Sequence, residues 1–189
     1  MTITELLPPA VEPVTLAEVK AHLRLETTEE DTLLTALIRT ARRHLESQTG
    51  LCLISRLLRL YLDDWPDGRV IQIARGPVQT IEIVTVYDAS GAPVELDTAG
   101  YVLDGAAWPA RLVLPERRAT ERALNGIEID FTAGFGESGA DVPDTLKRAL
   151  TLHVAAMFEL RGVLSLEDQP GAVPQGYERL IAPHCQRRL

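Results

Sequence analysis

The stretch with the most recognisable chemistry is glycine-rich and reads Gly134-Phe135-Gly136-Glu137-Ser138-Gly139. Its glycine spacing is typical of loops that bind the pyrophosphate of a dinucleotide after a strand. That chemistry needs the last glycine inside the first turn of a helix, whose N–H groups face the phosphates. Here residues 140–142 separate Gly139 from Pro143, where the next helix is expected to begin. We therefore interpret the stretch as a strand-to-helix loop and keep a small nucleotide-binding module or enzyme as the alternative function.

The histidines and cysteines have no spacing that predicts a metal or catalytic site. His153 falls on the apolar face of an expected helix, so we interpret it as a core or interface residue. Cys52 and Cys185 are far apart in the sequence, which favours neither a disulfide framework nor a zinc site. The remaining histidines are His22, His44 and His184.

Two adjacent carboxylates, Asp63 and Asp64, could act as an acid–base pair or bind a metal ion. They are followed closely by Pro66-Asp67-Gly68, a sequence typical of a tight turn, which explains them without chemistry. The sequence therefore predicts no catalytic residue, no cofactor and no metal site.

The composition is that of a folded chain with an acidic surface. The 189 residues are 46% hydrophobic and carry a net charge of −8. Such a chain does not hold nucleic-acid phosphate over a broad face, because that requires an excess of Lys and Arg. No apolar run reaches the roughly 18 residues that a membrane-spanning helix needs. We expect an intracellular protein without a membrane segment.

Three helices are expected to form the scaffold. Thr15-Leu16-Ala17-Glu18 is a capping box, which predicts a helix that runs to about Leu25. Acidic residues 29–31 begin a second helix, whose apolar residues recur at helical spacing up to Gly50. Pro143 begins a third, and Gly162 is expected to end it.

Between the second and third helices the residues favour strands. β-Branched and partly alternating runs are separated by turn sequences such as Asn125-Gly126. No helix-length segment lies between the runs, which excludes parallel crossovers and predicts a small antiparallel sheet or barrel-like insertion. Besides the apolar stretch 51–62, the runs are 70–73, 81–87, 101–103, 111–114 and 127–131.

The predicted fold class is therefore α+β, in a single domain that spans residues 1–189. It has a three-helix core (14–50 and 141–162), a β-rich antiparallel insertion (51–137) and an extended C-terminal arm (163–189). Prolines and glycines allow the arm at most one helical turn, near residues 177–181. The arm is too short to bury its own apolar residues, which indicates that they are exposed until a partner protein covers them. These residues are Val173, Tyr177, Leu180 and Ile181.

In their order and spacing, several segments together resemble the phage head–tail connector (adaptor) family, in its longer branch with a β-rich insertion that also occurs in gene transfer agents. The resemblance covers nearly the whole chain, from about residue 13 to the end. The segments that carry it are Pro13–Leu25, Glu29-Glu30-Asp31, Glu46–Gly50, Arg75-Gly76-Pro77-Val78, Phe131–Gly136, Val142–Ala149 and Leu180–Arg187.

This resemblance implies a structural protein without enzymatic activity or cofactor. Its copies would form a ring, commonly of twelve, beneath the portal of a virion or phage-like particle, after synthesis in the bacterial cytoplasm. The ring would extend the DNA channel, let DNA pass without specific binding, and dock a stopper or tail-completion protein. Another particle component, such as a stopper itself, is a third possibility.

Two hypotheses follow about how such a ring would work. The arm would fold onto the portal and bury its apolar side chains there, while its terminal arginines meet acidic groups. The portal-interface candidates are Tyr177, Leu180, Ile181, Arg187 and Arg188. The acidic charge would keep the channel from holding DNA phosphates.

Overall fold

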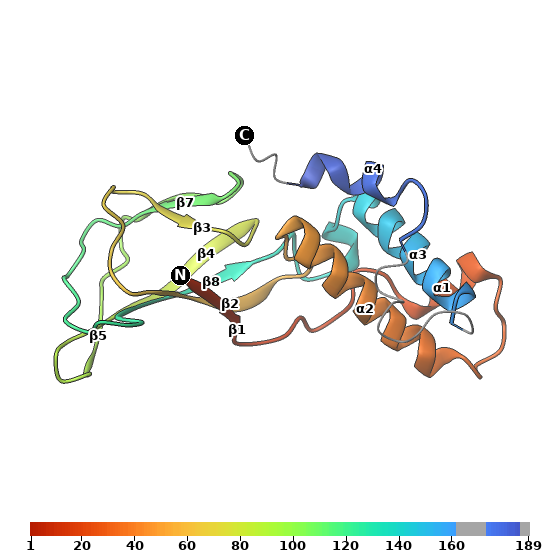
Figure 1. The fold of residues 1–189 in the computed structure, drawn as a ribbon, viewed down its shortest axis with the longest axis horizontal. Helices are drawn as coiled ribbons and strands as arrows, with labels where there is room; N and C mark the ends of the chain where they lie inside the picture. The colour runs from red at the N-terminus through yellow and green to blue at the C-terminus, as the bar shows by residue number, and fades with distance from the viewer. Residues whose placement is uncertain (162–172, 186–189) are drawn as a thin grey trace. The chain divides into compact units, whose positions relative to one another are not determined.

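The computed structural model describes residues 1–161 and 173–185. The chain divides into two compact units: a β-rich unit (Met1–Pro9 with Ser55–Phe135) and a helical unit (Ala10–Ile54 with Gly136–Leu189). Helices and antiparallel sheets make up these units (Figure 1), which confirms the predicted α+β class. None of the described helices is long and apolar enough to cross a membrane.

Four α-helices are described in the helical unit: α1 (Leu16–Leu23), α2 (Asp31–Thr49), α3 (Asp144–Glu159) and α4 (Tyr177–Ile181). α2 packs along α3, α1 contacts both, and α4 lies on α3 (Figure 1). The three predicted helices are confirmed, although α3 ends at Glu159; Gly162, expected to end it, lies outside the described residues. Their packed faces consist of aliphatic residues that are fully buried, among them Val19, Leu34, Leu45, Leu146, Leu150 and Val154.

The helix ends match the sequence signals. At α1 the Thr15 hydroxyl accepts the Glu18 N–H at 3.1 Å, and the Glu18 carboxylate accepts the Thr15 N–H at 2.6 Å. Donation to this carboxylate by the Thr15 N–H, and by the Thr15 hydroxyl at 2.7 Å, lowers the pKa of Glu18. Gly50 ends α2 in the left-handed conformation, with φ +75°.

A buried ion-pair network fixes α2 to the chain on both sides of it. The Arg42 Nε donates to Glu12 at 2.7 Å, and its Nη1 donates to Glu46 at 3.0 Å. The second Glu46 oxygen accepts the Leu53 N–H at 2.9 Å. The Arg42 and Glu46 side chains are only 6% and 8% exposed, so each needs these polar contacts to be tolerated in the core.

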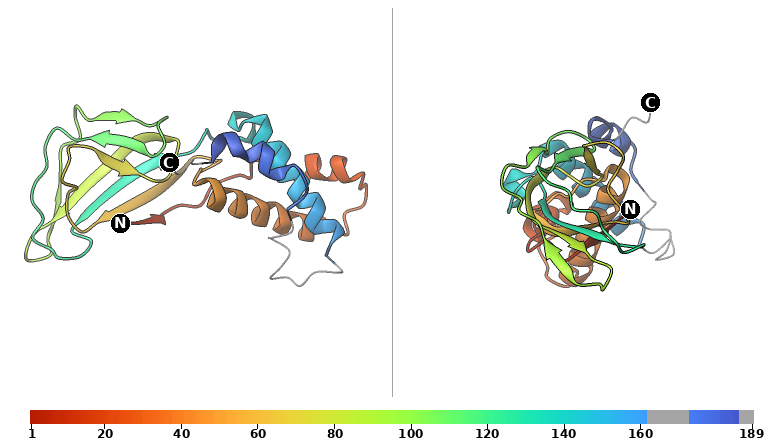
Figure 2. Two further views of the ribbon diagram at one scale, coloured as in Figure 1. Left: turned by 45° about the horizontal axis from the view of Figure 1, so that its top comes forward. Right: turned by 90° about the vertical axis from the view of Figure 1, so that its left-hand side faces the viewer.

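Two antiparallel sheets form the β-rich unit (Figure 2). The five-stranded sheet has the order β1 (Thr2–Glu5), β2 (Arg56–Leu62), β8 (Ile127–Ala133), β4 (Val78–Tyr87), β5 (Pro93–Glu95). The three-stranded sheet has the order β3 (Ile71–Ile73), β7 (Ala110–Val113), β6 (Val102–Asp104). All described strand pairs are antiparallel, as predicted, whereas β1 and β5 were not expected from the sequence.

Alternation in β2 and β8 separates an apolar face from a charged one. Leu60 and Ile129, which pair across the two strands, are fully buried. On the other face Arg59 lies opposite Asp130 and donates to it at 2.6 Å, with Glu128 at 2.7 Å from the same guanidinium. These contacts raise the pKa of Arg59, mainly through the hydrogen bond to Asp130. The second sheet adds buried Ile71, Ile73 and Leu112 to the core.

Replacing Glu46 with Ala should lower the free energy of unfolding by about 3 kcal/mol, because Arg42 and the Leu53 N–H lose a buried acceptor. The control is Gln48→Ala, at an exposed position on the same helix. This change should alter the free energy of unfolding by less than about 0.5 kcal/mol. Urea denaturation followed by far-ultraviolet circular dichroism measures both. Equal stabilities of the two variants would contradict this role of Glu46.

Candidate assembly interface

The glycine-rich loop is closed by the chain's own groups. The Asp141 carboxylate accepts the Ser138 N–H at 3.0 Å, and the Ser138 hydroxyl accepts the Ala140 N–H at 3.3 Å. A Cβ at Gly136 would lie 2.4 Å from this carboxylate, and one at Gly139 would lie 2.4 Å from the Pro13 carbonyl oxygen. Close packing therefore explains why glycine occupies both positions. The loop leads into a short 3₁₀ turn, Gly139–Asp141, and carries a negative charge where a phosphate would need N–H groups.

The acidic turn has the structural role that its sequence indicated. Asp63 accepts the Asn125 N–H at 2.9 Å, and Asp64 accepts the Trp65 N–H at 2.7 Å. The Trp65 indole in turn donates to the Arg118 carbonyl oxygen at 2.6 Å, and Arg117 lies over its ring. These contacts join the β2–β3 and β7–β8 loops.

Two histidines that are distant in the sequence come together in the helical unit. The ring of His44, on α2, lies 5.0 Å from that of His153, on α3, in an edge-on arrangement. His153 is fully buried, as its place on an apolar face indicated, and burial lowers the pKa of the half-buried His44. His184 contacts the Thr145 hydroxyl instead. No group of three metal-binding side chains occurs among the described residues.

The Tyr177 side chain of α4 packs on this histidine pair. Its ring centroid lies 5.4 Å from that of His153 and 6.1 Å from that of His44. Tyr177 is 1% exposed and Ile181 is 2% exposed. The prediction that these side chains stay exposed until a partner binds is therefore wrong. Tyr177 thus packs against imidazole rings from two helices, and Gly176, with φ +93°, precedes it at the start of α4. Burial also raises the pKa of Tyr177, whose hydroxyl has no hydrogen-bond partner within the described residues.

The remaining portal-interface candidates are placed differently. Leu180 is half-buried, and Arg187 and Arg188 lie outside the described residues. Val173, which was named only as an apolar residue of the arm, is also half-buried. In the described part of the predicted arm, residues 173–185, the chain is not fully extended, because it forms α4 and a 3₁₀ turn, Ala182–His184.

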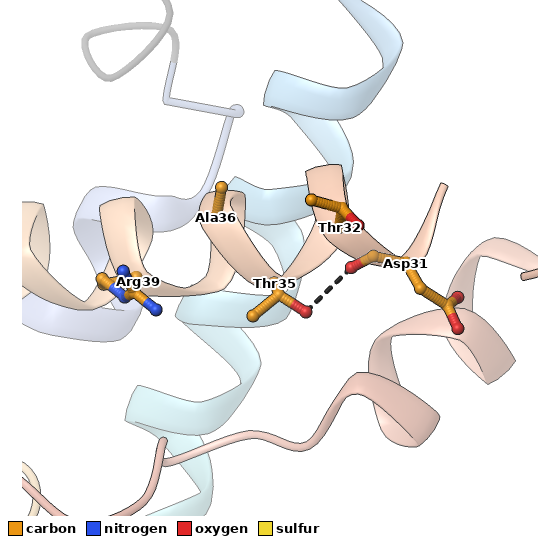
Figure 3. Close-up of a pocket in the computed structure, with 5 residues that line it drawn as sticks. All are labelled: Asp31, Thr32, Thr35, Ala36 and Arg39. Atoms are coloured by element: carbon orange, nitrogen blue, oxygen red, sulfur yellow. Dashed lines mark hydrogen bonds between the residues drawn. The ribbon is translucent and has the colours of Figure 1, made fainter. Parts of the chain in front are cut away.

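The described surface also has hollows. One, of about 420 Å³, lies along the exposed face of α2 (Figure 3), where the Thr35 hydroxyl donates to the Asp31 carbonyl oxygen at 2.8 Å. Thr32, Ala36 and Arg39 complete its lining. A second, of about 500 Å³, lies between the β5 region and Arg117. Neither lining contains a histidine or a cysteine.

Comparison with known proteins decides the family. The family model for phage gp6-like head-tail connector proteins matches residues 13–90. A chain from a structure titled "Neck of empty GTA particle computed with C6 symmetry" is 31% identical over all of this chain and 97% of that one, with a TM-score of 0.82. The protein belongs to the head–tail connector family. A chain from "Neck of native GTA particle computed with C12 symmetry" is 30% identical, again over all of this chain and 97% of that one, with a TM-score of 0.80. A search of curated proteins finds no match.

This head–tail connector is therefore a structural subunit, and the resemblance noted in its sequence is confirmed. The family model spans α1, α2 and the strands β2, β3 and β4. The likeness to the neck chains extends over the rest, including β8, α3 and the segment that holds α4.

Replacing Tyr177 with Phe should raise the free energy of unfolding by about 1 kcal/mol, because it removes a buried hydroxyl without a partner. Replacing it with Ala should lower that free energy by about 3 kcal/mol, because it removes the ring from the core. Urea denaturation compares the pair. A Phe variant less stable than the native chain would show that the hydroxyl has a partner after all.

Proposed function

We propose that this connector assembles into a ring of twelve copies at the head–tail junction of a phage or phage-like particle, without catalysing a reaction. The observation that carries the proposal is the full-length similarity to a chain from a neck reconstructed with C12 symmetry. The ring would attach to a portal protein on one side and to a stopper or tail-completion protein on the other.

A ring of identical subunits requires two different complementary surfaces on each copy. Such an interface is heterologous, and it closes when the rotation between neighbours divides a full circle. The chain has exposed apolar side chains in the described part of both units that could contribute to it. In the β-rich unit they include Leu7, at 60%, and Val102, at 66%, and in the helical unit Val11, at 45%.

We assign portal attachment to residues of the arm that follow the buried Tyr177 in the sequence. Because Tyr177 and Ile181 are buried in the helical unit, direct portal contacts by these two would require α4 to leave it. We instead assign the contact to Leu180, Arg187 and Arg188, and give Tyr177 and Ile181 the role of holding α4 in place. A weak contact per subunit suffices, since twelve linked copies raise the effective concentration.

The acidic composition suits a channel that DNA must pass through. Twelve copies at −8 each carry roughly −100 in total, and a negative channel wall repels phosphate. A basic wall would hold DNA instead, through the release of counterions.

Electron microscopy of the connector mixed with its portal protein tests the assembly directly, with twelve-fold rings on the portal as the expected result.

Co-sedimentation with the portal tests the two terminal arginines. Replacing Arg187 and Arg188 together with Glu should reduce co-sedimentation at least about tenfold, because each change places a negative charge against an acidic site. Arg69→Glu with Arg118→Glu, two exposed sites in the β-rich unit, is the charge-matched control and should bind like the native chain. Full binding by the double variant would remove the two arginines from the interface.

The isolated connector should bind duplex DNA with a dissociation constant weaker than about 10⁻⁴ M at physiological salt. Fluorescence anisotropy with a labelled duplex measures it across a salt series. Tight binding that weakens steeply with salt would contradict a channel that DNA passes freely.

A further inference from the structure

The β-rich unit has sheet edges that differ in how they are protected. A five-stranded and a three-stranded sheet leave four edge strands: β1 and β5 in the first, β3 and β6 in the second. An edge strand presents unpaired N–H and C=O groups, and proteins usually block it with proline, charge or a covering segment. Which edges lack such protection therefore indicates where another strand can add.

The β5 edge is blocked by a proline. The Leu96 N–H donates to the Val84 carbonyl and the Asp88 N–H to the Ala92 carbonyl. Hydrogen-bonded pairs alternate in an antiparallel ladder, so the main chain of Pro93, which pairs with Tyr87, points away from β4. Proline has no N–H to offer there.

The main-chain carbonyl groups just before β3 already accept hydrogen bonds from a side chain. The Arg117 guanidinium donates to the Gly68 carbonyl oxygen at 2.7 Å and also to that of Arg69, just before the strand. The same guanidinium lies over the Trp65 ring, so this side chain is fixed where it covers the backbone.

The β1 edge has no such cover in the described residues. The Leu6 N–H donates to the Leu57 carbonyl at 3.0 Å, so within β1 the hydrogen-bonded pairs with β2 are those of Thr2 and Thr4. The N–H and C=O groups of Ile3 and Glu5 therefore point outward, away from β2. The strand contains no proline or lysine, and its one charged residue, Glu5, is paired with Arg56 at 2.9 Å.

The β6 edge is comparable in length and also exposed. β6 ends the three-stranded sheet, and Val102 at its start is 66% exposed. β1 and the three-stranded sheet lie on different sides of the β-rich unit (Figure 2), as the two faces of a ring subunit must. The charged residues near both edges are already paired within the chain: Glu5 of β1 lies 2.9 Å from Arg56, and Arg111 of β7 pairs with Asp104 of β6.

We propose that β1 of one connector subunit pairs with β6 of the next, so that main-chain hydrogen bonds join the five-stranded sheet of one copy to the three-stranded sheet of its neighbour. This inference rests on the proposed ring and names the contact that closes it. Strand addition supplies affinity through the main chain, and the outward groups of Ile3 and Glu5 are the ones that it uses.

Cysteine cross-linking in portal-bound rings tests the contact. The variant carries Thr4→Cys and Val102→Cys in a Cys185→Ser background and is treated with a short bis-maleimide. Because each copy then has one reactive group at each edge, the expected product is a ladder of covalent chains longer than dimers. Each variant with only one of the two introduced cysteines is the control; it keeps the buried Cys52 and should give no ladder. Dimers from Thr4→Cys alone would show that β1 pairs with β1 and would overturn the proposal.

A backbone variant gives a second readout. Ile3→Pro removes an outward N–H without removing a hydrogen bond to β2, and it should reduce ring formation by about tenfold or more. Ile3→Ala removes the side chain but keeps that N–H, so it should form rings far better than the proline variant. Equal ring formation by the two would overturn the proposal.

The failures of the two proposals can be distinguished by microscopy of the same samples. Twelve-fold rings that form on the portal but give no ladder would overturn the β1–β6 contact and leave the ring intact. If no ring forms with the native chain, the proposed function fails, and the contact fails with it.

Discussion

The helical unit depends on one guanidinium. Arg42 contacts Glu12, which precedes α1, and Glu46, which lies one turn further along α2 and accepts the N–H of Leu53 beyond that helix. A buried charge is tolerated only when it is well paired, so the three segments are held in one arrangement. Apolar packing between α2 and α3 supplies the main driving force but is less directional. The network is what specifies how the chain enters and leaves the helix.

Local signals made much of this architecture predictable. The capping box at Thr15, the left-handed Gly50 and the acidic start of α2 are interactions among residues close in the sequence, so their physics is visible there. The same holds for the turn at Asp64 and for the alternation in β2, where leucines face the core. Even the failure of the glycine loop as a phosphate site followed from spacing alone.

The parts that the sequence did not predict depend on distant partners. Nothing near Tyr177 indicates that His44 and His153 lie together across two helices, so a segment rich in proline and glycine was expected to lack cover. β1 was missed because Thr2–Glu5 is short and mostly exposed, and its pairing with β2 spans more than fifty residues of chain. The role of Arg59 was likewise not predictable, because its partner, Asp130, lies on a strand that is distant in the sequence.

The loop junction around Trp65 has a spectroscopic consequence. The chain contains two tryptophans, Trp65 and Trp108, and both belong to the β-rich unit. Indole emission therefore reports on that unit alone, while the helical unit melts without an intrinsic fluorescent signal of this kind. Helix ellipticity and tryptophan emission thus give separate readouts for the two units, and a difference between their midpoints would show whether the units unfold independently.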